Sequence, residues 1–251
     1  MTSIKKIKVL YFYPELLNLY GDRGNIEIFT NRSFSRNLEI EIKEVKLGEK
    51  LNLKDFKEAD FIFMGGGSDL NQKALYEDLI KNKKGFLVDY IASNKPGLFI
   101  CGAYQLLGNY YETENGQKID GLGICNFYTK NEGKDLRSVG KIKLELASNL
   151  DEASFKTKES KFLYGFENHG GHTYFEEKLD PLGKVLYGFG NDRKSKTEGL
   201  VYRGIIGTYL HGPIFSLNPE FCDYFIKKIS GENDLKKLDD DLILQAREFL
   251  K

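Results

Sequence analysis

Three apolar segments in the first half of the chain each end at a turn and give way to a stretch with helical spacing. They cover residues 6–13 (KIKVLYFY), 59–67 (ADFIFMGGG) and 96–102 (PGLFICG). Short apolar runs that end in glycine are typical of buried strands, and the stretches after them have apolar residues at helical intervals. Alternating strands and helices predict an α/β fold of three layers, in which helices cover both faces of a mostly parallel sheet. Ligands of such sheets bind at the carboxyl ends of the strands.

The second half of the chain has a different texture. Short segments rich in β-branched and aromatic residues alternate with glycines and charged turns, which indicates further strands, partly antiparallel. These segments are IKLELAS, FLYGFENH, KVLYGFG and EGLVYRGIIGTYL. Two stretches with helical spacing follow residue 218. Without an internal repeat or a proline-rich linker, residues 1–251 are expected to form one domain, with a core at about 6–215 and C-terminal helices at about 218–251.

Composition excludes several classes of protein. The 251 residues include 37 Lys and Arg and 37 Asp and Glu, so no net charge draws in nucleic acid or an anionic membrane surface. The apolar runs are shorter than the roughly 20 residues that cross a bilayer, and the first residues lack a signal-peptide core. We therefore expect a cytoplasmic protein without membrane insertion.

Cysteine and histidine are scarce, and their positions suggest a thiol nucleophile. Cys101 lies at the turn after a predicted strand, and His211 follows another apolar run, GTYL. A thiolate next to an imidazole is the usual nucleophile and base pair of cysteine enzymes. The glycine-dense loop after residue 64 would let backbone N–H groups approach a developing oxyanion, although a plain turn also tolerates glycine.

The other cysteines and histidines are weaker candidates for catalysis or metal binding. Cys125 and Cys222 lie in apolar surroundings and are expected to pack in the core, and no CxxC pair indicates a zinc site or a disulfide framework. His169 and His172 share one short loop with only one acidic neighbour, so local hydrogen bonds are favoured over metal binding.

Six motifs together resemble the class I glutamine amidotransferases of the CobB/CobQ (cobyric acid synthase) type. Within that group the chain is most similar to the GatD family, the glutaminase subunits of lipid II isoglutaminyl synthases. The motifs follow the family order over about residues 6–215. They are LNLYGDRGN, GGGSD, ICGAYQLLG, GLGICNFYT, GFENHGGHTY and GTYLHGP.

The resemblance implies a role for individual residues. Cys101 matches the family's nucleophile and His211 its general base. Arg137 falls where the family places an arginine that binds the substrate L-glutamine. The resemblance also implies candidates for the oxyanion hole, namely Gly66, Gly67 and Gly102.

Two departures from the wider class stand out. Many class I enzymes carry an acidic residue two positions after the histidine, but here His211 is followed by glycine and proline. Either Cys101 and His211 act as a dyad, or a carboxylate comes from elsewhere, including a partner subunit. Phe99 and Ala103 also replace glycines that flank the cysteine in many relatives, and we expect the turn to tolerate both.

The resemblance also implies a reaction and a partner. The chain would hydrolyse glutamine through a glutamyl thioester, without a cofactor or metal of its own, and pass ammonia to a Mur-ligase-like MurT subunit in a heterodimer. That ligase would carry ATP and Mg²⁺, because this sequence has no GxxxxGK[ST] motif. The product would be D-isoglutamine in membrane-bound lipid II, a step of peptidoglycan synthesis. Alternatives are a glutaminase for a corrinoid-type synthetase, a stand-alone γ-glutamyl hydrolase, or a binding subunit without turnover.

Overall fold

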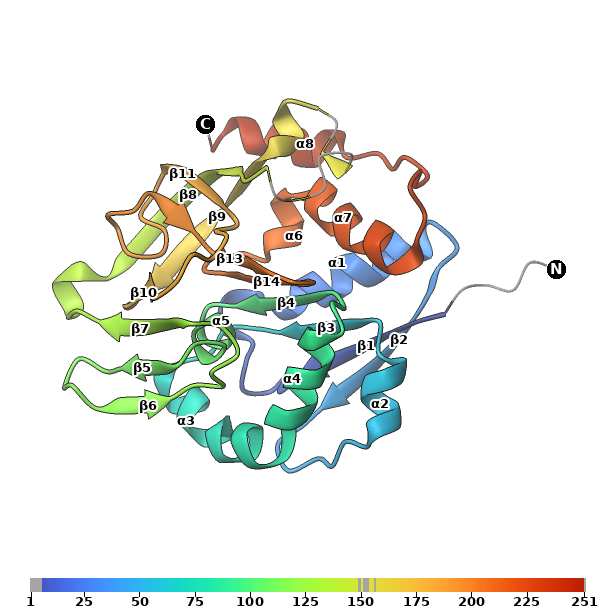
Figure 1. Cartoon of the computed structure of the whole chain (residues 1–251). Coiled ribbons are helices and arrows are strands. Elements are labelled where there is room, and N and C mark those ends of the chain that lie inside the picture. The colour runs from blue at the N-terminus through green and yellow to red at the C-terminus, as the bar shows by residue number, and fades with distance from the viewer. Residues whose placement is uncertain (1–5, 149, 151–153, 156, 251) are drawn as a thin grey trace.

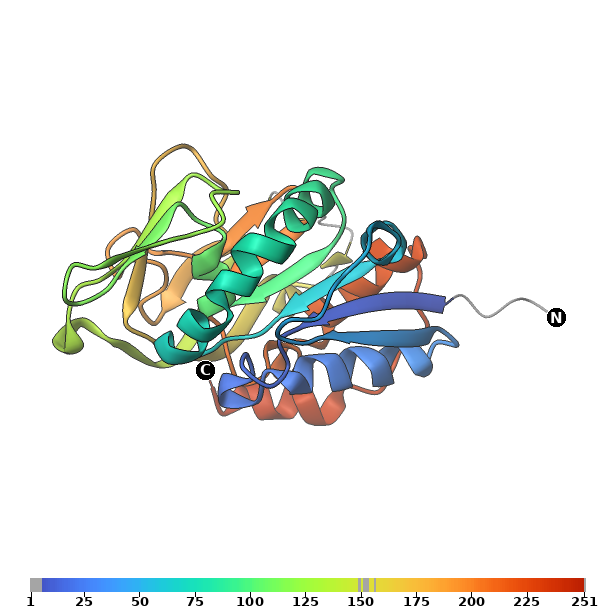
Figure 2. The same cartoon turned by 90° about the horizontal axis from the view of Figure 1, so that it is seen from below.

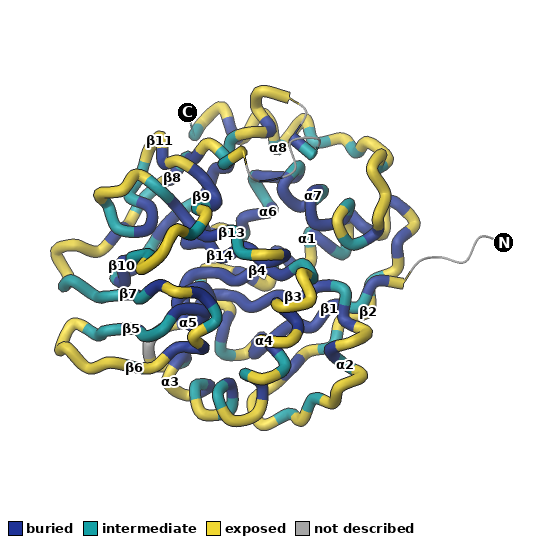
Figure 3. The backbone as a smooth tube through the Cα atoms, viewed as in Figure 1, coloured by how far each residue is buried: buried dark blue, intermediate teal, exposed yellow. Residues whose placement is uncertain are grey.

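Six strands form the central sheet of the protein, seen in a computed structural model that describes residues 6–148, 150, 154–155 and 157–250 (Figure 1). In spatial order they are β13 (Leu200–Tyr202), β14 (Ile205–Thr208), β4 (Gly97–Ile100), β3 (Phe61–Met64), β1 (Lys6–Phe12) and β2 (Glu39–Val45). Neighbouring strands are parallel except for β13, which pairs antiparallel with β14. Strands β3 and β4 are buried along their whole length (Figure 3), as expected for central strands covered on both faces.

Helices cover both faces of this sheet (Figure 2). Helices α1 (Arg23–Phe34) and α7 (Pro219–Ser230) lie on one face, and α3 (Asp69–Asp78) and α4 (Lys84–Ala92) lie on the other. The remaining helical segments are shorter: η1 (Leu19–Gly21), α2 (Leu53–Glu58), η2 (Leu79–Lys83), α5 (Gly102–Leu106), η3 (Lys134–Leu136), η5 (Glu159–Lys161), α6 (Ile214–Leu217) and α8 (Asp241–Glu248). The predicted three-layer α/β fold is confirmed.

Two four-stranded sheets lie together at one end of the central sheet, on the left of Figure 1. The first contains β5 (Tyr110–Glu112), β6 (Lys118–Asp120), β7 (Phe127–Asn131) and β10 (Gly171–Phe175). The second contains β8 (Ser138–Leu146), β9 (Phe162–His169), β11 (Gly183–Tyr187) and β12 (Thr197–Glu198). All their pairings are antiparallel except β5 with β7, which confirms the expected antiparallel strands of the second half.

Helix α7 shows how the sequence sets a helix and its packing. Pro219 occupies its first turn, where a missing N–H costs nothing, and Gly231 ends it with a φ of 74°. Its buried side chains include Phe221 and Phe225, and Phe225 meets Phe61 of β3 at a ring-centroid distance of 5.2 Å. The apolar face of α7 thus closes the core on that side of the sheet.

The stretch with helical spacing that follows β3 is not one regular helix. A wider π-helical turn, η2, separates α3 from α4. This turn brings the buried ammonium of Lys83 to the carboxylate of Asp78, which also accepts the hydroxyl of Tyr13 at 2.9 Å. The π-helical turn thus coincides with a buried ion pair inside the helical stretch and a tertiary hydrogen bond from Tyr13. In the described part of the chain, no helix has the length and apolarity to cross a membrane.

Candidate active site

Cys101 follows β4 directly and forms the turn into α5. Its backbone has φ 49° and ψ −105°, a conformation that L residues rarely adopt, so the surrounding structure must hold it. The Cys101 amide donates to the carbonyl of Thr208 in the adjacent strand at 2.7 Å. The predicted strand-to-helix elbow is therefore present, with the thiol at the carboxyl end of β4 and 6% of the residue exposed.

His211 lies at the same end of the sheet because β14 runs parallel to β4. Ile100 pairs with Thr208, so the residues just beyond them emerge side by side. The His211 amide donates to the carbonyl of Phe166 in β9 at 2.7 Å, and the Phe166 amide donates back at 3.2 Å. Two hydrogen bonds from a different sheet therefore fix the backbone that carries the imidazole.

Asp22 supplies an acidic partner for this histidine from within the chain. One carboxylate oxygen, Oδ1, lies 3.2 Å from Nδ1 of His211, and the other, Oδ2, accepts the Gly66 amide at 2.7 Å. Asp22 and the His211 side chain are both buried. Asp22 belongs to the LNLYGDRGN motif, from which no role was predicted for it. The available signal was an acid in the glycine-containing loop after β1, whose carboxyl end lies at the same edge of the sheet.

The surroundings of His211 favour its charged form. Burial disfavours the imidazolium, but the hydrogen bond to Asp22 and the proximity of the Cys101 thiol outweigh it and raise the pKa of His211 to about 10. The other ring nitrogen, Nε2, is buried and makes no well-aligned hydrogen bond within the described residues. This nitrogen is consequently available to a thiol, a leaving group or a water molecule.

The glycine loop after β3 packs against these three side chains. A Cβ atom at Gly66 would lie 2.7 Å from Cε1 of His211 and 3.2 Å from Cβ of Cys101, so no larger residue fits without movement. The Gly66 amide is already bonded to Asp22. Of the three oxyanion candidates, Gly67 and Gly102 have backbone N–H groups that donate to no side chain among the described residues.

A pocket of about 450 Å³ opens beside Cys101, within the usual range for small ligands. Polar side chains from five segments line it: Gln72, Gln105, Asn131, Arg137, Asn168 and His169. Tyr20 and Leu70 stand at the same pocket and are 40% and 77% exposed. The lining is thus polar around the nucleophile and includes exposed apolar side chains.

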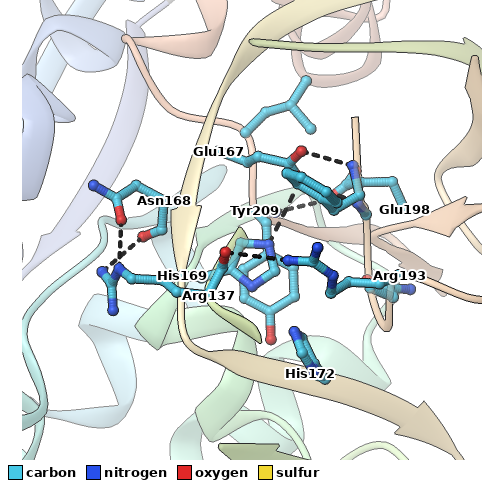
Figure 4. Close-up of polar contacts among 12 residues, drawn as sticks. Arg137, Glu167, Asn168, His169, His172, Arg193, Glu198 and Tyr209 are labelled. Carbon is cyan, nitrogen blue, oxygen red and sulfur yellow. Dashed lines mark hydrogen bonds and ion pairs between the residues drawn. The ribbon is translucent and has the colours of Figure 1, made fainter. Parts of the chain in front are cut away.

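Arg137, to which the family resemblance assigned substrate binding, brings a cation to the lining of this pocket. Figure 4 shows its contact with Asn168. Its Nε donates to Oδ1 of Asn168 at 2.7 Å, and one terminal nitrogen reaches the Asn168 carbonyl at 3.4 Å. Arg193 donates to the carbonyls of Leu136 and Arg137, each at 3.1 Å, which fixes the backbone of that loop. The exposed guanidinium therefore has a defined direction and remains accessible to a carboxylate.

His169 makes a local hydrogen bond, as the sequence favoured, but His172 bonds to residues distant in the chain, and the two histidines lie in β9 and β10 and not in the expected loop. Nδ1 of His169 lies 2.7 Å from the Gly171 carbonyl, and the ring stacks on Tyr209 at a centroid distance of 3.8 Å (Figure 4). Burial lowers the pKa of His169. The two nitrogens of His172 contact Glu132 at 3.0 Å and the Leu136 carbonyl at 3.1 Å. Hydrogen bonds thus account for both nitrogens of His172.

Glu198 is a buried carboxyl that no sequence pattern indicated. It accepts the Tyr209 amide at 2.7 Å and the Thr208 hydroxyl at 3.0 Å, just before His211. Burial raises its pKa to about 8, although these hydrogen bonds lower it in part. Glu198 therefore anchors the segment that delivers the histidine.

The remaining cysteines are buried away from this chemistry. Burial raises the pKa of Cys125 to about 12 and that of Cys222 well above its ordinary value. A buried thiol with a raised pKa is a poor nucleophile, so their surroundings are those of packing residues.

Comparison with known proteins adds independent findings. Residues 8–219 match the CobB/CobQ-like glutamine amidotransferase domain. The GatD subunit of the glutamine-hydrolysing lipid II isoglutaminyl synthase from Staphylococcus aureus is 38% identical over 249 residues, which cover 98% of this chain and 95% of that protein. The GatD subunit from Streptococcus pneumoniae is 36% identical over 213 residues, or 85% of this chain and 76% of that protein.

Solved structures of low sequence identity share the fold. Thermotoga maritima PurLQS matches with a TM-score of 0.58 at 12% identity, covering 90% of this chain and 98% of that chain. The glutaminase domain of Trypanosoma brucei CTPS with bound acivicin gives the same TM-score and identity, covering 92% and 98%. The architecture described above is therefore one that recurs among distant proteins.

Proposed function

The chain belongs to the CobB/CobQ-like glutamine amidotransferase domain family, and from this we propose that it is the glutamine-hydrolysing subunit of a lipid II isoglutaminyl synthase. The observation that carries the catalytic part is the arrangement of Cys101, His211 and Asp22 around Gly66. Such a set of nucleophile, base and orienting acid performs acyl transfer on unrelated folds. The amide of glutamine is the acyl donor in this family.

Substrate binding uses the pocket beside Cys101. The α-carboxylate of glutamine pairs with the Arg137 guanidinium, which lines the pocket and is oriented by Asn168. The side-chain amide then lies toward Cys101, whose turn and strand neighbours fix the sulfur. Binding of the carboxylate thus sets the distance between the amide carbon and the nucleophile.

Catalysis proceeds in two acyl-transfer steps. The Cys101 sulfur attacks the amide carbon and forms a tetrahedral oxyanion, which backbone N–H groups of the glycine loop and the elbow stabilise. The C–N bond breaks as His211 gives its proton to the departing nitrogen, so ammonia leaves and a glutamyl thioester remains. His211 then takes a proton from water, which attacks the thioester and releases glutamate and the free thiol. Asp22 keeps Nε2 of the imidazole directed at the reacting atoms.

The reaction that consumes the ammonia takes place on a partner subunit. Every step above uses groups of this chain alone, so we place no cofactor in it and assign ATP and Mg²⁺ to a Mur-ligase-like MurT subunit. That ligase would activate the α-carboxyl of D-glutamate in lipid II for amidation. Ammonia released into neutral water becomes mostly ammonium, which is not a nucleophile, so direct transfer within a heterodimer is expected.

Glutamate release from glutamine tests this proposal. The purified chain, its Cys101→Ala variant and a Cys222→Ala control are assayed with and without the ligase subunit. We expect hydrolysis by the wild type and the Cys222→Ala control, increased by the partner, and at least about a 10³-fold loss in Cys101→Ala. Undiminished activity in Cys101→Ala would exclude the thioester mechanism. Amidation of a corrinoid acceptor in place of lipid II would move the chain to the other synthetase class.

A further inference from the structure

Gln72 lies between the glycine loop and the nucleophile elbow. It belongs to the first turn of α3 and is only 9% exposed, yet it lines the pocket that contains Cys101. Its side-chain nitrogen, Nε2, donates to the Gly67 carbonyl at 3.2 Å and reaches Oε1 of Gln105 at 3.5 Å. One carboxamide thus connects the loop after β3 to the helix after β4.

The same carboxamide also packs against the backbone next to the nucleophile. A Cβ atom at Gly102 would lie 2.6 Å from Nε2 of Gln72 and 2.8 Å from its Cδ. The Gln72 amide plane therefore rests on the α-carbon of Gly102, in space that any side chain there would occupy. Gln72 consequently sets how closely the Gly67 segment approaches the elbow.

Peptide geometry links this contact to the direction of the loop's N–H groups. In a trans peptide the carbonyl and the N–H point in opposite directions, so a bond that fixes one also fixes the other. A carbonyl shares its peptide with the N–H of the next residue. The Leu19 amide donates to the Gly66 carbonyl at 3.0 Å and so fixes the Gly67 N–H. Gln72 donates to the Gly67 carbonyl and so fixes the Ser68 N–H. Glycine gives the backbone unusual freedom to rotate, so these two external donors are what hold consecutive peptides of the loop.

We propose that Gln72 is a positioning residue for oxyanion stabilisation. It holds the Gly67–Ser68 peptide by the Gly67 carbonyl and spaces the loop against Gly102, so that the neighbouring Gly67 N–H keeps its place relative to the elbow when negative charge develops on the substrate carbonyl. This inference rests on the proposed glutamine hydrolysis and adds to it a residue that does not touch the reacting atoms. Preorganised donors contribute most when they need no movement at the moment of reaction.

The variant for the test is Gln72→Met, which keeps the length of the side chain and removes its donor. Exposed Gln245→Met on α8 is the matched control. We expect Gln72→Met to lower kcat by about 10²-fold with KM for glutamine changed by less than about threefold, because the lost stabilisation acts in the transition state. The control should match wild type. The partner subunit is present in all reactions.

A pair of cysteine probes separates positioning of the loop from general damage. Glutamate γ-semialdehyde adds to the thiol through a new S–C bond, while its carbonyl oxygen takes the charge and needs the same amides. With iodoacetamide, the thiolate attacks the methylene carbon and displaces iodide, so no oxyanion forms. Gln72→Met should lose about 10²-fold in semialdehyde affinity and less than about threefold in alkylation rate. Equal losses with both probes, or unchanged kcat, would overturn the proposal.

Gln72→Glu supplies a second test if Gln72→Met folds poorly. The carboxylate has the same shape and repels the Gly67 carbonyl, whereas the protonated acid can donate to it. Activity relative to wild type should therefore rise as the pH falls, and a ratio that is independent of pH would contradict the positioning role. Failure of wild type itself to show Cys101-dependent hydrolysis would instead reject the proposed function.

Discussion

Nδ1 of His211 lies 3.2 Å from Oδ1 of Asp22, although 189 positions separate the two residues in the chain. The contact exists because β1 and β14 belong to one sheet and the loops after them emerge at the same edge. A buried carboxylate in this position orients the imidazole and stabilises its positive charge. The fold therefore supplies the acid that the sequence next to His211 lacks.

Replacing Asp22 by asparagine is expected to impair catalysis without unfolding the chain. The neutral amide no longer supports the imidazolium, so the pKa of His211 falls and the alkaline limit of kcat/KM moves to lower pH. We expect a loss in kcat of about 10²- to 10⁴-fold, by analogy with triad acids in general. Exposed Asp89→Asn is the control. A normal rate and an unchanged pH profile would mean that a partner carboxylate orients His211.

Arg137→Ala should weaken glutamine binding. If the guanidinium holds the α-carboxylate, its loss raises KM by about 10- to 100-fold and affects kcat less. Arg137→Lys should be intermediate because it keeps the charge and loses the planar fork. Lys134→Ala removes an exposed charge from the same segment and should leave KM unchanged. Equal KM values for Arg137→Ala and wild type would show that another group binds the carboxylate.

Gly66→Ala tests the space between the catalytic groups. The new Cβ would lie 2.7 Å from Cε1 of His211, so either the imidazole or the loop must move. Because small displacements of reacting groups are costly, activity should fall by about 10²-fold or more. Gly85→Ala in α4 is the matched control, since a Cβ there meets nothing within 4 Å. That control should gain about 0.5–1 kcal/mol of stability with normal activity.

Glu198→Gln should change how stability depends on pH. The folded-state pKa of about 8 lies above the ordinary glutamate value of 4.5, so between these values the folded chain binds more protons than the unfolded chain. Stability contributed by this group therefore falls as the pH rises from 4.5 to 8, and levels off above 8. The glutamine variant lacks this decline.

Urea unfolding at pH 5 and pH 9 measures the effect. Between pH 5 and pH 9 the unfolding free energy of wild type should fall by at least about 1 kcal/mol more than that of Glu198→Gln. Exposed Glu232→Gln should show no such difference. An identical pH dependence in wild type and Glu198→Gln would mean that the buried carboxyl does not titrate in this interval.

Local chemistry in the sequence predicted much of the scaffold. The apolar runs that form β1, β3 and β4 are each followed by a turn and a helical stretch, and this local alternation predicted the parallel α/β fold. Helix α7 matches its predicted span because its proline, glycine and apolar face act locally. The π-helical interruption at η2 was missed, because apolar spacing does not distinguish one wide turn, and the Tyr13 hydroxyl that contacts Asp78 there is distant in the chain.

The sequence alone determined the strand-to-helix elbow at Cys101 and drew attention to His211 and the glycine loop, because turns, apolar runs and scarce residue types are local features, whereas Arg137 was singled out only by the family resemblance. Only the tertiary structure decided what these residues face. Asp22, Glu198 and Gln72 acquire their roles from contacts with residues that are five or more positions away in the chain. No local sequence pattern distinguishes a carboxylate or an amide that contacts such a partner from one that contacts water. Strand order and register bring them together, and these depend on packing of the whole sheet.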